Sequence, residues 1–319
     1  YVYVMRDVNY ENYRSADQYR DINSARNVTE LRQALATHQG AAFVNTIAAD
    51  VEGGALYADM SAIPNVSSEL IERCAVDTEN GQRAITLNGS DPSCNWQIDS
   101  RAAYPGLMPP TEQPSLITDT YVSNSNDSYW LSNPDNPLEG FSPIIGNEQL
   151  TRSLRTRAGF KFVEEVLNSD QKLNQSLVQD LLFNHRHYGA EIFLDDILTV
   201  CVQSENLQEA CDILAQWDRR QDLDSVGAVI FNRFWSIAGT VSDHYLVPFD
   251  VNNPIHTPSG LKIEEAVTQE FITASLQEAV ASLNEAEIPL DAKWGDVQFV
   301  LRNEDKIGIP GGSGRQGMF

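Results

Sequence analysis

The chain has 319 residues, enough for one large domain or two ordinary ones, and 42% of them are hydrophobic, as is usual in globular proteins. Acidic residues outnumber basic residues 45 to 22, and the resulting formal charge of -23 would repel phosphate backbones and anionic lipid head groups. This composition argues against nucleic-acid binding, and no uncharged apolar run approaches the roughly 18 residues that a membrane-spanning helix requires.

The first predicted element is a short helix in residues 27–40, NVTELRQALATHQG. Asn27 is a typical N-cap, and Glu30, three residues later, is its expected capping-box partner. Two leucines four residues apart give the helix an apolar face, and Gly40 is expected to end it.

A β-hairpin is predicted next. Residues 42–50 alternate as a strand, the letters VEGG make a turn, and ALYADMSAI returns as a second arm that ends at Pro64. Alternation places Asn45 on one face of the first arm with Phe43 and Ile47. A buried amide without partners costs about 1 to 3 kcal/mol. Asn45 is therefore expected either to satisfy a loop backbone or to donate its N–H to a reacting carbonyl.

The second half of the chain has a different pattern. Residues 101–150 hold seven of the 14 prolines, which predicts a long ordered loop or a covering strap. From residue 151 the apolar spacing becomes helical. The helical segments include the one carrying Leu173, Leu177 and Leu181 and the stretches IFLDDILTV, ENLQEACDILAQW and IEEAVTQEFITASLQEAVASL. A late strand is predicted at WGDVQFVL, residues 294–301.

Four cysteines form two sequence-local pairs, Cys74 with Cys94 and Cys201 with Cys211. Four cysteines allow three pairings, of which local pairing is the simplest, and an even count suits an exported protein. Buried free thiols in a cytosolic enzyme are the competing interpretation. A zinc site is disfavoured because the chain has no Cys-x-x-Cys spacing and no His close to any of the four.

Three further motifs suggest chemistry only by their letters. GSGRQG at 312–317 matches a dinucleotide-binding fingerprint, but two residues follow it in the given sequence where the fingerprint needs a helix, so we interpret it as a glycine-rich turn. Ser242, Asp243 and His244 are neighbours in sequence, whereas a catalytic triad is an arrangement in space. HRH at 185–187 is interpreted as a surface helix end, and no pattern predicts a metal site.

A series of long irregular motifs follows one order along the chain, most densely in residues 38–146. The motifs are HQGAAFVNTIAADVEGGALYADMSAIPNV, the loop from Cys74 to Cys94, PGLMPP, and TYVSNSNDSYWLSNPDNPLEGFSPIIG. From about Met5 to Phe319, the chain resembles the second (beta) chain of the penicillin acylase family of N-terminal nucleophile hydrolases. Within that family it looks most like the N-acyl-homoserine lactone acylases and their lipopeptide-acylase relatives.

The resemblance implies an α+β fold, part of an αββα N-terminal nucleophile hydrolase core with a largely helical second half. Residues 1–150 are then expected to form the sheet-containing part of the hydrolase core and a Pro-rich covering loop. Residues 151–293 are expected to form a mainly helical region. Residues 294–319 are expected to supply a return strand and the Gly-rich turn of the core.

The resemblance also implies a mechanism. In that family a zymogen cuts itself and exposes a serine at the start of the beta chain, and the α-amino group of this serine acts as its base. The serine attacks an amide, an acyl-enzyme forms, and water releases the acid. By the match to VNTIAAD, Asn45 corresponds to the side-chain donor of the oxyanion hole. Arg73, in ELIERC, corresponds to an arginine that supports the active site and orients that asparagine; a surface ion pair with Glu69 or Glu72 is the alternative.

The chain departs from this pattern, because its first residue is Tyr1 and no residue of the chain can be assigned as the nucleophile. The chain begins YVYVMRD, without an initiating methionine or a leader, and stops at GGSGRQGMF. We therefore expect an internal part of the beta chain. The nucleophile, the backbone oxyanion donor and most of the acyl pocket are expected upstream of Tyr1. The alpha chain and the first part of the beta chain, from the same precursor, are the expected partners.

The function implied is hydrolysis of the amide of N-acyl small molecules, most of all N-acyl-homoserine lactones, the signals destroyed in quorum quenching. Penicillin or cyclic-lipopeptide acylase activity is the alternative within the enzymes. A non-catalytic exported binding module is the alternative of another class. We expect no metal or organic cofactor and a periplasmic or secreted location in a bacterium.

Overall fold

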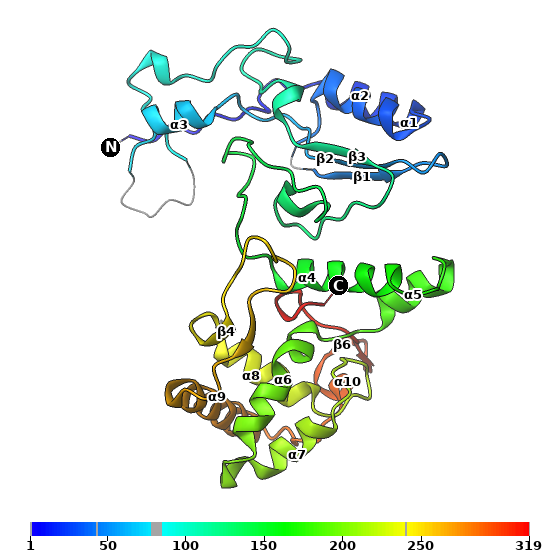
Figure 1. Cartoon of the computed structure of the whole chain (residues 1–319), viewed down its shortest axis with the longest axis vertical. Helices are drawn as coiled ribbons and strands as arrows, with labels where there is room; N and C mark the ends of the chain where they lie inside the picture. Colours follow the sequence, from blue (N-terminus) through cyan, green and yellow to red (C-terminus); the bar gives the residue numbers. More distant parts are fainter. Residues whose placement is uncertain (1, 43, 78–84, 240, 319) are drawn as a thin grey trace. The chain divides into compact units, whose positions relative to one another are not determined.

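The computed structural model describes residues 2–42, 44–77, 85–239 and 241–318 (Figure 1). The chain divides into two compact units, Tyr1–Gln149 and Leu150–Phe319, and each is described by itself. Helices occur together with small antiparallel sheets, so the predicted α+β class is confirmed. Across the described ranges, no helix combines the length and the apolar composition needed to cross a membrane.

The first unit carries a small sheet and helices in its described parts. The helices are α1 Ser15–Ser24, α2 Val28–His38 and α3 Ser68–Cys74, and the strands are β1 Thr46–Ala49, β2 Ala55–Ala58 and β3 Ser115–Thr118. The strand order is β1-β2-β3, with both pairings antiparallel. The predicted hairpin is therefore confirmed, although its first arm is a shorter strand than residues 42–50.

Strand β3 lies inside the Pro-rich segment 101–150, where the sequence predicted only a loop or strap. It pairs Ser115 with Ala58 and Thr118 with Ala55, so β2 becomes the central strand. Four residues are too few for alternation to reveal a strand, and the pairing partner is far away in sequence. The strand forms because β2 presents a second free edge to it.

Helix α2 begins as predicted. The Asn27 side chain accepts a hydrogen bond from the backbone N–H of Glu30 at 2.9 Å, as an N-cap does. The Glu30 carboxylate accepts from the backbone N–H and the guanidinium of Arg26 instead of completing the expected capping box. Both arrangements satisfy backbone donors at the helix start.

The end of α2 differs from the prediction. The helix ends at His38, and Gln39 takes the left-handed conformation with φ +44°. Gly40 follows this cap, and a Cβ there would lie 2.5 Å from the backbone carbon of Arg14. Gly40 is thus needed for the close approach of two backbone segments and not as the residue that terminates the helix.

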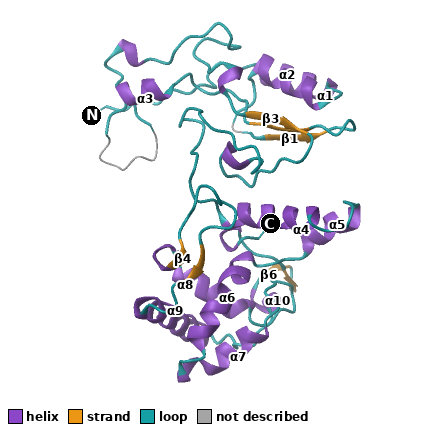
Figure 2. Cartoon of the chain, viewed as in Figure 1, coloured by secondary structure: helices purple, strands orange, loops and turns teal. Residues whose placement is uncertain are grey.

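One face of the sheet packs against α1 and α2 (Figure 2). The fully buried members of this core are Val28, Leu35, Leu56, Ala58 and Met60, with Ile22, Leu31, Ala36 and Ala48 packed around them. In β1 and β2 these are the side chains at 48, 56 and 58, so residues at alternate positions face the other way.

The second unit is mainly helical (Figure 2). Its helices are α4 Leu154–Leu167, α5 Gln175–Phe183, α6 Tyr188–Cys201, α7 Gln208–Gln216, α8 Ala228–Ala238, α9 Ala266–Glu285 and α10 Trp294–Val297. Its strands are β4 Tyr245–Val247, β5 Ser259–Leu261, β6 Phe299–Arg302 and β7 Asp305–Gly308. Helices α6, α8 and α9 supply most of a large core with stacked aromatic rings at Phe193, Phe231 and Trp235.

The late strand predicted at 294–301 is wrong in its first half. Trp294–Val297 is the short helix α10, and the strand β6 begins at Phe299 and pairs only with β7 among the described strands. Trp294 is buried, and its indole N–H donates to the carbonyl of Gly311 at 3.0 Å. This anchor sets the local backbone, and an eight-letter apolar pattern could not distinguish the two conformations.

The glycine-rich turn at 312–317 is confirmed. Gly314–Gln316 forms one turn of 3-10 helix, and Ser313 and Gln316 cap each other's backbone N–H groups. Gly317 follows with φ +79°.

Both local cysteine pairings are confirmed. Cys74 bonds to Cys94 and ties the end of α3 to the short turn Pro92–Cys94. Cys201 bonds to Cys211 and ties the end of α6 to α7. The alternative of buried free thiols is therefore excluded by the structure.

His187 is not at a surface helix end, which corrects the interpretation of HRH. Its ring is fully buried, and Nδ1 accepts a hydrogen bond from the backbone N–H of Ala190 at 3.0 Å, so His187 caps α6. The ring packs edge-on against Phe231, with centroids 4.9 Å apart. Burial lowers the pKa of His187 to about 3.

His187 should make stability fall in acid. Between about pH 3 and the ordinary histidine pKa near 6.5, the unfolded chain binds a proton here that the folded chain excludes. His187→Asn keeps a capping oxygen but removes the titrating ring. We expect a lower thermal midpoint at pH 7 from lost packing, yet a smaller further drop on acidification to about pH 4.5 than in wild type. Equal drops in thermal melts of both proteins would contradict this account.

Candidate functional site

Asn45 lies immediately before β1 and is exposed. The prediction that it sits buried among apolar residues is wrong: Ile47, two residues on, is also exposed, and Phe43 lies outside the described residues. The reason is that β1 is an edge strand, and its side chains at positions alternate to Ala48 face away from the core beneath α1 and α2. An exposed amide is available for a ligand without first being desolvated.

The hairpin register gives Asn45 its partner. Pairing of Thr46 with Ala58 and of Ile47 with Tyr57 places Asn45 diagonally across from Tyr57 on the same face. The Tyr57 hydroxyl donates to Asn45 Oδ1 at 2.7 Å. Tyr57 itself is completely buried in the central strand. A rigid, buried side chain therefore holds an exposed one.

Asp50 fixes the turn that sets this register. Its Oδ1 accepts hydrogen bonds from the backbone N–H groups of Glu52 at 3.0 Å and Gly54 at 2.9 Å. Its Oδ2 accepts from the backbone N–H of Val28 at 3.1 Å, at the start of α2. These backbone hydrogen bonds, that from Val28 first, lower the pKa of Asp50. One ionised carboxylate thus joins the hairpin turn to the helix that covers the sheet.

Burial controls the ionisation of the groups around Tyr57. It raises the pKa of the Tyr57 hydroxyl far above its ordinary value, with smaller contributions from Asp59 and Tyr129. Burial also raises the pKa of Asp59 to about 6. Tyr57 is therefore a protonated hydrogen-bond donor at neutral pH.

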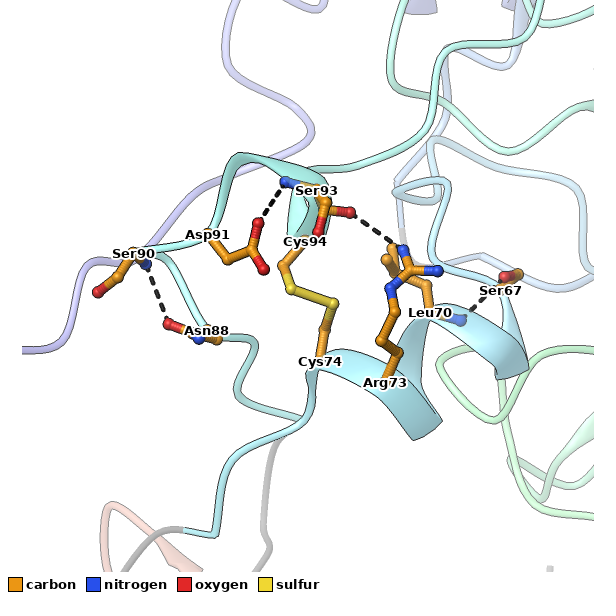
Figure 3. The surroundings of a disulfide bond; sticks show 9 residues. All are labelled: Ser67, Leu70, Arg73, Cys74, Asn88, Ser90, Asp91, Ser93 and Cys94. Carbon is orange, nitrogen blue, oxygen red and sulfur yellow. Dashed lines mark hydrogen bonds between the residues drawn. A yellow bond between two sulfur atoms is a disulfide. The ribbon is translucent and has the colours of Figure 1, made fainter.

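Arg73 lies in the last turn of α3, beside the first disulfide (Figure 3). Its Nη2 donates to the backbone carbonyl of Ser93 at 3.1 Å, so it bridges the two ends of the Cys74–Cys94 loop. Among the described residues, Arg73 forms no ion pair with a glutamate of α3 and no hydrogen bond with Asn45. The guanidinium is exposed.

Tyr57 is the functional candidate that sequence reasoning missed. The stretch ALYAD was assigned to the second arm, but the contact with Asn45 depends on the register, which a sequence does not state. A signal was present in the letters: a tyrosine in a central strand needs a partner for its hydroxyl.

The other suggestive motifs do not form sites. His244 shares a hydrogen bond of 3.0 Å with the Thr268 hydroxyl and stacks on Phe271 with centroids 4.2 Å apart. These contacts place its ring in the packing of α9 and not in a triad. Over the described part of the chain, no three His, Cys, Asp or Glu side chains gather as a metal-ligand set.

A family model described as penicillin amidase matches residues 2–316. Acyl-homoserine lactone acylase PvdQ of Pseudomonas syringae pv. syringae (strain B728a) is 33% identical over 325 residues, covering 100% of this chain and 42% of that protein. Its namesake in Pseudomonas putida is 33% identical over 319 residues, covering 99% and 40%. Aculeacin-A acylase of Actinoplanes utahensis is 34% identical over 338 residues, covering 99% and 42%.

The chain thus spans about two fifths of the length of these relatives, and the match runs along all of it. The relatives are similar to this chain at nearly equal identity although their names refer to different compounds. Since the family model covers nearly every residue, the resemblance seen in the sequence is confirmed, and the protein belongs to the penicillin amidase family.

Proposed function

We propose that this chain is the part of an amide-cleaving acylase that supplies Asn45 as a side-chain donor to the oxyanion. The observation that carries the proposal is the exposed Asn45 amide, held through Oδ1 by the buried Tyr57 so that Nδ2 is directed away from the sheet partner. No described residue accepts a hydrogen bond from Nδ2. An N–H donor aimed in advance at a developing negative oxygen stabilises the transition state without reorganisation.

The remaining groups of the mechanism are proposed to come from the same precursor, upstream of this chain. A serine exposed by autoproteolysis attacks the amide carbonyl, and its own α-amine, with a pKa near neutrality, takes the hydroxyl proton. The carbonyl oxygen becomes negative in the tetrahedral intermediate and accepts from Asn45 Nδ2 and from a backbone N–H. The proton passes to the leaving amine, and water then releases the acyl group. The αββα core of the family is the proposed frame for these groups.

N-acyl-homoserine lactones are the proposed substrates, which would make the enzyme a quorum-quenching one. The support is the similarity to two proteins named acyl-homoserine lactone acylase. Penicillin or cyclic-lipopeptide acylase activity is the second candidate, because aculeacin-A acylase is equally similar. Two disulfides support the proposed periplasmic or secreted location, since such bonds persist in oxidising compartments.

The first test is an assay of the complete, processed precursor on N-acyl-homoserine lactones, with release of the homoserine lactone amine as the readout. We expect amide cleavage that is unchanged by chelators, whereas residues 1–319 alone should cleave nothing. Measurable activity of the isolated chain above a heat-treated control would contradict the proposal that the nucleophile comes from the upstream part of the precursor. A precursor that processes but cleaves no N-acyl amide would favour the non-catalytic exported module.

The second test is at Asn45. In the processed enzyme, Asn45→Ala should lower kcat by about 100 to 1,000-fold, because one oxyanion donor is lost, with little change in thermal midpoint. Asn45→Asp should be worse than alanine at neutral pH, since an ionised carboxylate would face the oxyanion, and should partly recover as the carboxyl is protonated in acid.

Before the kinetic measurements, mass spectrometry confirms that the precursors of both Asn45 variants have been cleaved. A purely structural asparagine would give lower thermal midpoints and a nearly normal kcat in the folded fraction. A near-wild-type kcat in processed Asn45→Ala would therefore remove Asn45 from the oxyanion hole.

The third test concerns Arg73, which we propose supports the site by holding the Cys74–Cys94 loop. Arg73→Lys keeps the charge but loses the planar fork that reaches the Ser93 carbonyl. We expect a clear loss of activity in the complete enzyme. Lys306→Arg, in the second unit, is the control. It exchanges the same two residue types in the opposite direction, and its activity should stay at the wild-type value. Full activity of Arg73→Lys would show that Arg73 is only a surface cation without a role in the site.

A further inference from the structure

An asparagine side chain can present either its oxygen or its nitrogen to a ligand, because the amide can turn by half a revolution. Only one orientation serves an oxyanion: Nδ2 outward donates, whereas Oδ1 outward would repel. The exposed position of Asn45 leaves both rotations sterically possible. Something in the fold must therefore choose between them.

The Tyr57 hydroxyl makes this choice. This hydroxyl has a single proton, and burial keeps that proton on the oxygen. This proton points to Asn45, and the 2.7 Å contact is made with Oδ1. A donor can only hold the oxygen of the amide, so the nitrogen must face outward.

We propose that Tyr57 is a positioning residue of the site, which fixes the rotation of the Asn45 amide through the hydrogen bond that its hydroxyl donates to Oδ1. The inference rests on the proposed oxyanion role of Asn45 and deepens it. Tyr57 does not touch the substrate. Its contribution is that the donor is already aimed before the reaction, so no free energy is spent on turning it in the transition state.

The test is Tyr57→Phe in the complete, processed enzyme. The ring and its packing remain, and only the hydroxyl is lost. We expect kcat to fall by about 3 to 10-fold, the effect of one hydrogen bond, with KM within about twofold of wild type. Tyr188→Phe is the control, because it removes the hydroxyl of another buried tyrosine, at the start of α6 in the second unit. Its kcat should stay at the wild-type value.

A double-mutant cycle then separates positioning from general stability. In an Asn45→Ala background, Tyr57→Phe should cause no further loss of kcat, because the group that it aims is absent. An independent loss in that background, or a wild-type kcat in the single Tyr57→Phe variant, would overturn the inference. If Tyr57→Phe does not process, a neutron structure of the processed wild-type enzyme replaces it, and an Asn45 Nδ2 that faces the Tyr57 hydroxyl overturns the inference as well.

The proposed function and this inference fail in different ways. A normal kcat in Asn45→Ala would refute the oxyanion role and the inference with it. A loss of about 100-fold or more in Asn45→Ala, together with a normal kcat in Tyr57→Phe, would refute the inference alone.

Discussion

The antiparallel register between β1 and β2 is the constraint on which the candidate site depends. Pairing of Ile47 with Tyr57 places Asn45 and Tyr57 on one face, while Leu56 points into the core beneath α1 and α2. A slip of one residue would turn the tyrosine hydroxyl into that core and expose the leucine, which alone costs about 1.5 to 3 kcal/mol. Asp50 opposes such a slip because its carboxylate binds both the turn and the N-terminus of α2. The position of an exposed amide is thus set by buried residues.

Much of the fold could be predicted from local signals. The N-cap at Asn27, the hairpin and the helices after residue 150 follow from side chains that act on their own neighbourhood. Strand β3 could not be predicted, because four residues in a Pro-rich segment become a strand only by pairing with β2. His187 was misplaced for a similar reason: its polar letters suggest a surface, but the ring is used to cap α6 inside an aromatic core. Where tertiary contacts determine the conformation or burial of a segment, its composition alone gives the wrong prediction.

The candidate site, too, has residues that the sequence predicted and one that it did not. Asn45 was found from a motif, although the expected burial was wrong and the edge position of β1 explains the exposure. Arg73 was also found from a motif, and its observed contact is with the Ser93 carbonyl in the disulfide loop. The orienting contact on Asn45 comes instead from Tyr57, twelve residues away in sequence and adjacent only after the hairpin has formed. Residues that act through another side chain are invisible to motif matching, because their role is defined by distance and direction.

The most direct measurement of the central claim is a crystal structure of the complete, processed enzyme with a tetrahedral adduct on its nucleophile, such as one formed by an acyl-chain boronic acid. The account predicts that Asn45 Nδ2 lies about 3 Å from the adduct oxygen, the distance expected for an oxyanion donor. It also predicts that the Tyr57 hydroxyl still holds Asn45 Oδ1. An adduct oxygen bound by other donors, with the Asn45 amide directed elsewhere, would contradict the account.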